Sequence, residues 1–227
     1  ILMKHNETIN FEPISTNNII LAYKNGIFPM AENEDSPDIF WVEPKRRGII
    51  DIKGISINRK IKKLIKQNIY DVRINTNFTK VIEGCAKKSP KRKTTWINGS
   101  IIDAYIKLHQ KGYAHSIECY SNNILIGGLY GVSIGSIFFG ESMFSNKDGA
   151  SKIALLHLLE RLKVGKYIVL DTQFITNHLK FFGAKEISQK KFLQILKIAL
   201  ESKGSFFEID KNNTVENKKY PILENFT

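Results

Sequence analysis

Three polar side chains follow apolar runs, at positions expected to be the ends of strands. Glu141 comes directly after a glycine-rich apolar run, and Asp171 and Gln173 follow a second one. Alternate side chains of an extended backbone share a face, so Asp171 and Gln173 are expected to point the same way. A carboxylate and an amide placed together can accept a proton from an amine and donate to a developing oxyanion. A glutamate in apolar surroundings must find a cationic partner or shift its pKa.

Simpler structural explanations of the same residues stay open at this stage. The apolar runs 124–132 and 136–139 flank a short link at residues 133–135 and predict a hairpin. Its glycines could serve only to make room for a packed helix, which would leave Glu141 exposed at the rim. Asp171 could be the N-cap of a helix over residues 172–179.

Other familiar chemistries find no support in the sequence. The five histidines lack metal-ligand spacing, so we expect no metal. The chain has neither a G-x-x-x-x-G-K-[ST] loop nor a G-x-G-x-x-G fingerprint, so we expect neither nucleotide hydrolysis nor dinucleotide binding. Trp96, Tyr23 and Met30 are candidate stacking groups for a nucleic-acid base, although a tryptophan is more often a core anchor.

The composition favours a sizeable core and a polyanionic partner. Of the 227 residues 42% are hydrophobic, and the formal net charge is +12. Such a charge favours nucleic acid first and an anionic membrane surface second, although a lysine-rich composition also arises from genomic base bias. No apolar run approaches the about 20 residues that a membrane span needs. With two cysteines, Cys85 and Cys119, and no export signal, a reducing cytoplasm is the expected setting.

The order of the expected elements indicates an α/β fold of the α+β type around a mixed sheet. A helix at residues 16–24 and short strands precede the pattern strand, helix, helix, three-strand meander, helix, strand, helix, strand. We predict a small N-terminal α/β domain at residues 1–55, a catalytic domain at 56–204 and a polar, loosely packed tail at 205–227.

Two basic segments are candidates for contact with a polyanion. The pattern predicts an amphipathic helix over residues 56–68, and a basic loop spans residues 87–93. A charged face is usually only solvated, but five cations with no acid between them favour an anionic partner. The cations of the helix are Arg59, Lys60, Lys62, Lys63 and Lys66.

Nine short motifs follow one another between about Ala22 and Phe192. They are AYKNGIFPM (22–30), FWVEPKRRG (40–48), VIEGCA (81–86), TWI (95–97), AHSIE (114–118), GGLYGV (127–132), GESMFS (140–145), ASK (150–152) and DTQF (171–174). In this order they resemble the bacterial leucyl/phenylalanyl-tRNA–protein transferases. The pairing of GESMFS with D-x-Q some thirty residues later is highly specific to that family.

The resemblance implies an enzyme that needs no cofactor. Such an enzyme moves leucine, phenylalanine or sometimes methionine from an aminoacyl-tRNA to a protein's N-terminal Arg or Lys, which marks that protein for degradation by the N-degron route. It also implies a catalytic domain similar to the GNAT acyltransferases, preceded by a small domain. We expect a monomer with no membrane partner.

The resemblance assigns roles to individual residues. Glu141 would hold amino groups, and Asp171 and Gln173 would lie at the reaction centre. Trp96, Met30 and Tyr23 would line the substrate site, and the apolar side-chain pocket would be formed by Leu129, Phe138 and Leu158. The acceptor stem of the tRNA would be bound through its phosphates by the basic helix, by the basic loop 87–93 and by Arg46 and Arg47.

Our mechanistic hypothesis is that Asp171, helped by Gln173, orients and deprotonates the attacking amine while Gln173 steadies the oxyanion. Asp171 could instead only orient the amine.

Many family members have tryptophan where this chain has Met30, and the usual glycine-rich segment before the first helix is replaced by NFEPIS (10–15). The rival functions are an acetyl-CoA-dependent N-acetyltransferase and a non-catalytic RNA-binding module; residues 145–150 lack the pyrophosphate loop of the former.

Overall fold

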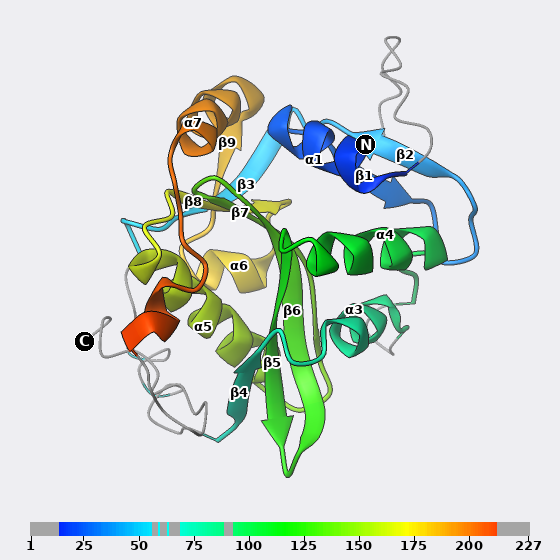
Figure 1. The fold of residues 1–227 in the computed structure, drawn as a ribbon, viewed down its shortest axis with the longest axis vertical. Helices are drawn as coiled ribbons and strands as arrows, with labels where there is room; N and C mark the ends of the chain where they lie inside the picture. Colours follow the sequence, from blue (N-terminus) through cyan, green and yellow to red (C-terminus); the bar gives the residue numbers. More distant parts are fainter. Residues whose placement is uncertain (1–13, 56–58, 60–62, 64–68, 89–92, 213–227) are drawn as a thin grey trace.

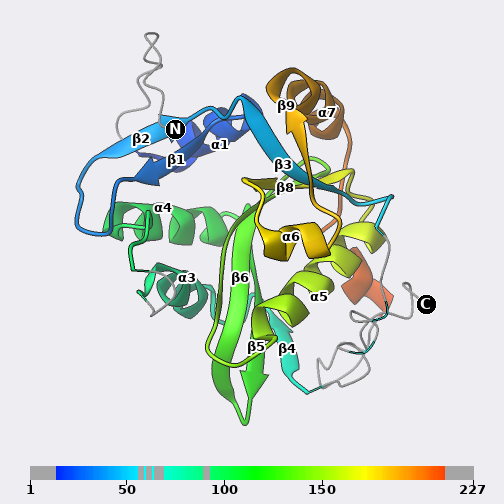
Figure 2. The same ribbon diagram turned by 180° about the vertical axis from the view of Figure 1, so that it is seen from behind.

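A seven-stranded mixed sheet, with strand order β4-β5-β6-β7-β8-β3-β9, forms the centre of the fold (Figures 1 and 2). The computed structural model describes residues 14–55, 59, 63, 69–88 and 93–212. The strands of this sheet are β3 (Arg46–Asp51), β4 (Asp71–Ile74), β5 (Ala114–Ser121), β6 (Ile124–Ile134), β7 (Ile137–Ser145), β8 (Val169–Gln173) and β9 (Lys185–Ser188). A separate two-stranded sheet pairs β1 (Phe28–Ala31) with β2 (Ile39–Val42). The predicted mixed α/β architecture is confirmed.

Helices cover both faces of the large sheet. They are α1 (Thr16–Lys24), α3 (Phe78–Ala86), α4 (Gly99–Gln110), α5 (Ala150–Val164), α6 (Asn177–Phe181), α7 (Gln189–Glu201) and the 3-10 helix η1 (Glu208–Asn212). Alternation along β6 and β7 divides the core into two clusters, because Tyr130 and Phe139 face α1, α3 and α4 while Leu129 and Phe138 face α5.

The predicted hairpin is present as β6 and β7, within an antiparallel meander that begins with β5. One of its glycines does make room for a helix, because a Cβ on Gly127 would lie 2.6 Å from the Cβ of Ala150 at the start of α5. The structural explanation of the glycine-rich run is therefore correct for Gly127. It is wrong for Glu141, which faces a pocket.

The strands β7 and β8 are parallel neighbours for only a short distance. They pair at residues 137–139 and 169–171, and both continue beyond that point without pairing to each other. A crevice beyond the carboxyl ends of parallel strands is a favoured place for a ligand. Glu141 on β7 and Gln173 on β8 both lie past the last paired residues.

Three expectations about local structure need correction or lie outside the described residues. Asp171 is no helix cap, since α6 begins after Thr176, whose side chain accepts the Leu179 N–H. Residues 205–212 are not a loose tail: Phe206 is buried, and Asp210 pairs with the buried Arg161. Of the predicted basic helix, only residues 59 and 63 are described, and both are helical.

The N-terminal segment and the large sheet share a strand. Residues 46–51 lie inside the predicted small domain, yet they form β3, which pairs with β8 and β9. The proposed domain boundaries remain predictions. None of the helices in the described part of the chain has the length and apolarity required to cross a bilayer.

Candidate active site

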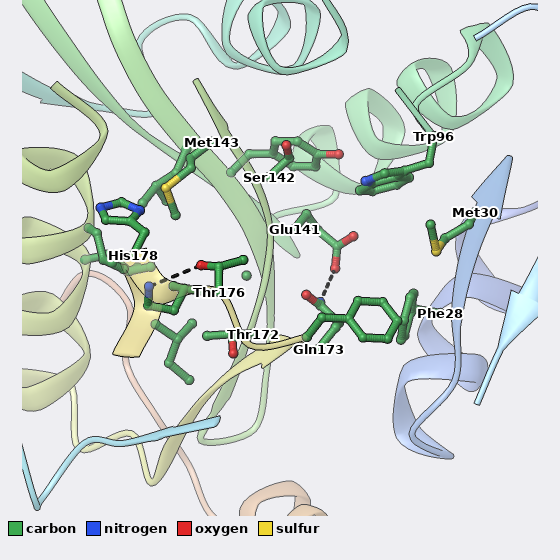
Figure 3. Close-up of a pocket in the computed structure, with 18 residues that line it drawn as sticks. Phe28, Met30, Trp96, Glu141, Ser142, Met143, Thr172, Gln173, Thr176 and His178 are labelled. Atoms are coloured by element: carbon green, nitrogen blue, oxygen red, sulfur yellow. Dashed lines mark hydrogen bonds between the residues drawn. The ribbon is translucent and has the colours of Figure 1, made fainter. Parts of the chain in front are cut away.

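A pocket of about 400 Å³ opens where β7 and β8 separate. Figure 3 shows Phe28, Met30 and Trp96 at one end and Met143, Thr176 and His178 at the other, with Glu141 and Gln173 between them. The wall is largely apolar, and its aliphatic side chains are Leu129, Met143, Leu155, Leu158, Leu170 and Leu179. Such a pocket with a few convergent polar groups suits a small apolar ligand group that carries a polar end.

Glu141 is the carboxylate of this pocket and makes no salt bridge among the described residues. Its Oε1 accepts a hydrogen bond from the Tyr23 hydroxyl at 2.6 Å, and its Oε2 accepts one from the Tyr105 hydroxyl at 3.2 Å. Burial raises the pKa of Glu141 from 4.5 to about 7; the Tyr23 hydrogen bond opposes that rise, and the Asp171 charge adds to it. The carboxyl group can therefore gain or lose a proton near neutral pH, as a general acid or base does.

Two buried phenols fix the position of that carboxylate. Tyr23 comes from α1 and Tyr105 from α4, and both are fully buried. Because Tyr23 donates its one hydrogen to Glu141, Tyr105 shares its own hydrogen between Glu141 Oε2 and the Tyr23 oxygen. Burial raises the pKa of both phenols well above 10.0, so each donates a hydrogen bond rather than ionising. The prediction that Tyr23 could stack on a base is wrong, because its ring is inaccessible. Tyr105 was not singled out, although a tyrosine on a buried helix stripe needs a partner for its hydroxyl.

Removing one phenol should change the acidity of Glu141 without changing the pocket's shape. Tyr23→Phe deletes a hydrogen bond that favours the ionised carboxylate, so the pKa of Glu141 should rise further, by about one unit. Carbon-13 NMR titration of the glutamate carboxyls would measure it. Tyr113→Phe, on a half-exposed tyrosine that is no partner of Glu141, is the control and should leave the titration unchanged. If the pKa of Glu141 were unchanged or lowered in Tyr23→Phe, the Tyr23 hydrogen bond would not be what favours the ionised carboxylate.

Gln173 lies beside Glu141, and its side-chain amide can bind both Glu141 and a ligand in the pocket. Its Nε2 donates to Glu141 Oε1 at 3.1 Å. A side-chain amide nitrogen carries two hydrogens, so the second N–H remains for a ligand oxygen. The backbone of Gln173 is unusual, with a φ of 53° in a residue that is not glycine.

Asp171 does not face the pocket. Its side chain is fully buried, and its Oδ1 and Oδ2 accept hydrogen bonds from Arg47 Nε and Nη2 at 2.9 and 2.6 Å. Oδ1 also accepts the backbone N–H of Gln173 at 2.9 Å. The expectation that Asp171 and Gln173 point the same way is wrong, and so is the hypothesis that Asp171 takes a proton from a substrate.

The predicted tRNA-binding cations have different surroundings. Arg47 is only 1% exposed, so the prediction that it contacts phosphates is wrong. Arg46 is exposed and pairs with Glu186 at the surface. Arg59 and Lys63 are exposed helical residues. The remaining predicted cations lie outside the described residues; they are Lys60, Lys62 and Lys66. The loop 87–93 is described only at its ends, where Lys88 pairs with Glu34.

Most of the predicted substrate residues do line the pocket. Trp96, Met30, Leu129 and Leu158 contribute to its wall. Phe138 does not: it is fully buried and stacks on Phe206 in the core, with ring centroids 5.7 Å apart. The wall also contains residues that were not anticipated, namely Phe28, Tyr130, Gly140, Ser142, Thr172, Phe174, Thr176 and His178.

Two polar atoms of the wall are buried without a hydrogen-bond partner in the described residues, Thr172 Oγ1 and His178 Nε2. Burial lowers the pKa of His178, so its imidazole is neutral at pH 7. No group of three or more side chains in the described residues is arranged to hold a metal ion.

Comparisons with known proteins agree in pointing to one family. The family described as leucyl/phenylalanyl-tRNA protein transferase matches residues 49–197, and its N-terminal domain matches residues 12–45. A leucyl/phenylalanyl-tRNA–protein transferase of Ruegeria sp. (strain TM1040) is 48% identical over 193 residues, which cover 85% of this chain and 90% of that one. One from Maricaulis maris (strain MCS10) is 49% identical over 188 residues, or 83% and 87% of the two chains.

A solved structure, described as that of L-PGS from Bacillus licheniformis, resembles this chain with a TM-score of 0.41 and 12% identity. The likeness covers 80% of this chain and 61% of that one.

Proposed function

Because this chain belongs to the leucyl/phenylalanyl-tRNA–protein transferase family, we propose that its pocket transfers leucine or phenylalanine from tRNA to the amino terminus of a protein. The observation that carries the proposal is the pairing of Glu141, with a pKa of about 7, and the Gln173 amide at the edge of an apolar pocket. The pocket would hold the amino-acid side chain, and the two polar groups would act on the ester and the amine.

The reaction forms a C–N bond and breaks the C–O ester bond to the tRNA ribose. The nucleophile is an α-amino group with a reference pKa of about 7.7–8.0, which is close to that of Glu141. We assign Glu141 to take one proton from this amine as it attacks, and to return it to the departing ribose oxygen. The ester is already activated, so the step needs no ATP.

Gln173 is assigned to the carbonyl oxygen. Negative charge develops on that oxygen in the tetrahedral intermediate, and a preorganised N–H donor stabilises it. The Nε2 group already donates one hydrogen to Glu141 and has a second for the oxyanion. The two residues would then act on the two atoms that change charge.

The rest of the pocket suits the two ends of an aminoacyl ester. The aliphatic wall would take an apolar side chain without a branch at Cβ, and such a pocket separates ligands that differ by one methylene by only about 1–3 kcal/mol. Some methionine transfer is therefore expected beside leucine and phenylalanine. The aromatic end, with Phe28, Trp96 and Phe174, would stack on the terminal adenosine next to Met30.

The acceptor protein, the cellular compartment and the oligomeric state are further parts of this proposal. We assign the acceptor as a protein with N-terminal Arg or Lys, marked by transfer for degradation, and the enzyme as a cytoplasmic monomer. Both cysteines, Cys85 and Cys119, are buried and neither forms a disulfide, as a reducing compartment permits. The rival acetyltransferase would bind acetyl-CoA tightly, and an RNA-binding module would bind tRNA without transfer.

Two described cations allow a test of the tRNA contact. Replacing both Arg59 and Lys63 by glutamine should weaken tRNA binding and flatten the plot of log affinity against log salt by about 2, one for each lost phosphate contact. Titration of labelled tRNA at several salt concentrations would measure the slope. The matched control replaces Lys190 and Lys197, which are exposed on α7, and should leave the slope unchanged. Equal slopes in both double variants would remove Arg59 and Lys63 from the interface.

The function itself is tested by transfer of labelled leucine from leucyl-tRNA, without ATP, to two peptides that differ only in their first residue. Label should appear on the peptide that begins with Arg and not on the one that begins with Ala. Transfer to both would disprove the acceptor rule. Transfer to neither, with tRNA still bound, would favour the RNA-binding alternative.

A further inference from the structure

The backbone at Gln173 has a conformation that ordinary residues avoid. The N–H of Phe174 donates to the carbonyl of Thr172 at 2.6 Å, which closes a three-residue γ-turn around Gln173. With the φ of Gln173 at 53°, this is the rarer and strained form of the turn. Strained backbone of this kind persists only where the surrounding structure holds it, and it is concentrated at functional sites.

The neighbouring strand is shaped to receive this turn. Gly48 pairs with Gln173 and Ile49 with Asp171, so Thr172 is an extra residue, a bulge, on β8. A Cβ on Gly48 would lie 2.7 Å from Thr172 Oγ1 and 3.0 Å from the carbonyl carbon of Phe174. The turn therefore packs directly on the backbone of Gly48, where only glycine leaves room.

A buried ion pair holds the turn from its other side. Asp171 Oδ1 accepts both the Gln173 N–H and Arg47 Nε, each at 2.9 Å. The guanidinium is itself fixed, because its Nη1 donates to the Gly26 carbonyl at 2.8 Å. Its carbon lies 4.9 and 4.4 Å from the ring centroids of Phe28 and Phe192. Every contact of Arg47 thus restrains the carboxylate that restrains Gln173.

Stability alone is a weak reason for this pair. Two buried charges repay their loss of hydration only with good geometry, and apolar residues of similar volume often stabilise a fold as well or better. What an apolar pair cannot supply is an acceptor for the Gln173 N–H. The geometry points to a role in placing the Gln173 side chain.

We propose that Arg47 is a positioning residue: through Asp171 it holds the γ-turn at Gln173, and that turn directs the Gln173 amide to Glu141. This inference rests on the proposed role of Gln173 in transfer. Arg47 itself touches no substrate, since it is buried outside the pocket wall. Lysine cannot replace it, because an ammonium lacks the planar fork that binds both oxygens of a carboxylate.

The first test compares Arg47→Lys with Arg73→Lys, which alters only contacts with Asn123 and Tyr120 outside the pocket wall. Arg47→Lys should lower kcat about 10²-fold, as a small misplacement of a reacting group does, with KM for leucyl-tRNA within twofold. Arg73→Lys should change neither kcat nor KM. A rise in KM with kcat unchanged would overturn the inference.

A double-mutant cycle separates positioning from general structural support. If Arg47 acts through Gln173, adding Arg47→Lys to Gln173→Ala should slow transfer no further. Effects that multiply in the double variant would show that Arg47 acts elsewhere and would overturn the inference. A variant in which only Arg47 is replaced can unfold because it leaves the Asp171 carboxylate buried without its partner. The paired variant Arg47→Met with Asp171→Leu removes both charges, so its melting temperature should stay near that of the wild type while its kcat still falls. A well-folded paired variant that retains kcat would also overturn it.

An NMR measurement keeps this inference apart from the proposed function. The side-chain amide signals of Gln173 and the backbone amide signal of Phe174 should move in Arg47→Lys and stay in place in Arg73→Lys. If Gln173→Ala transfers as fast as the wild type, the proposed role of Gln173 fails, and the NMR result alone decides whether Arg47 holds the turn. Unmoved signals would refute the inference whatever the activity.

Discussion

Replacing Glu141 by glutamine is expected to lower kcat/KM for transfer about 10²–10⁴-fold, the usual contribution of a positioned general base. Glutamine keeps the size of the side chain and can still accept a hydrogen bond from Tyr23 or Tyr105, but it cannot take a proton from the amine. The rate of leucine transfer to an Arg-initiated peptide measures the loss. Glu186→Gln, at an exposed surface pair, is the matched control and should retain full activity.

The same substitution should make the protein more stable above neutral pH. The folded pKa of Glu141, about 7, lies above its ordinary value of 4.5, so folding favours the protonated form. Between these values the folded protein binds more protons than the unfolded one, and stability falls as the pH rises through this window. Above pH 7 the rise in pKa corresponds to about 3 kcal/mol of destabilisation, which glutamine does not suffer.

Thermal or urea unfolding at pH 8 and pH 5 would measure this gain. Glu141→Gln should exceed the wild type clearly at pH 8 and lose most of that advantage at pH 5. The wild-type enzyme should also lose transfer activity below about pH 7, as Glu141 becomes protonated. A stability difference that is the same at both pH values, or activity unchanged down to pH 5, would refute the assignment of Glu141 as the base.

Gln173→Ala is expected to lower kcat about 10²–10³-fold, as loss of one oxyanion donor does in other acyl transfers. The KM for leucyl-tRNA should change little, because the apolar and aromatic walls that hold the ester remain. Single-turnover transfer at saturating tRNA would isolate the chemical step. Gln194→Ala, on an exposed position of α7, provides the control.

The loss of transfer activity in Gln173→Ala can appear in kcat, in KM or in both, and each result has a different meaning. A higher KM with kcat unchanged would make Gln173 a binding residue and would leave the oxyanion without a protein donor. Loss of kcat alone would support a contact made only in the transition state.

The motifs placed Glu141 and Gln173 at the site, and the family resemblance that the motifs carry supplied the apolar wall residues Leu129 and Leu158. The alternation rule failed between Asp171 and Gln173, because it assumes a regular strand and this one has a bulge and a γ-turn. No glycine or proline on β8 indicates the bulge or the turn in the sequence. The glycine that permits both, Gly48, lies on a strand far away in the sequence.

Arg47 was misassigned because it belongs to a run of basic residues, which usually lies on the surface. In a strand, successive side chains point to opposite faces, so Arg46 is exposed and Arg47 is buried. The burial of Arg47 could have been predicted only if the basic run had been recognised as part of strand β3. Tyr105 was missed because only the packing of distant segments brings its hydroxyl to Glu141, and Phe174 was missed because only such packing brings its ring to the pocket wall.

Tyr23 lies in the segment matched by the N-terminal family domain and donates to Glu141 in the segment matched by the second family model, and the Gly26 carbonyl of the first segment accepts from Arg47, which lies between the two. The two family segments are consequently joined by a side-chain contact at the pocket as well as by the peptide chain. Hybrids that join residues 12–45 of one relative to residues 49–197 of another will work only where these contacts match on both sides of the junction. The boundary between the two segments is thus a poor place for recombination between divergent genes.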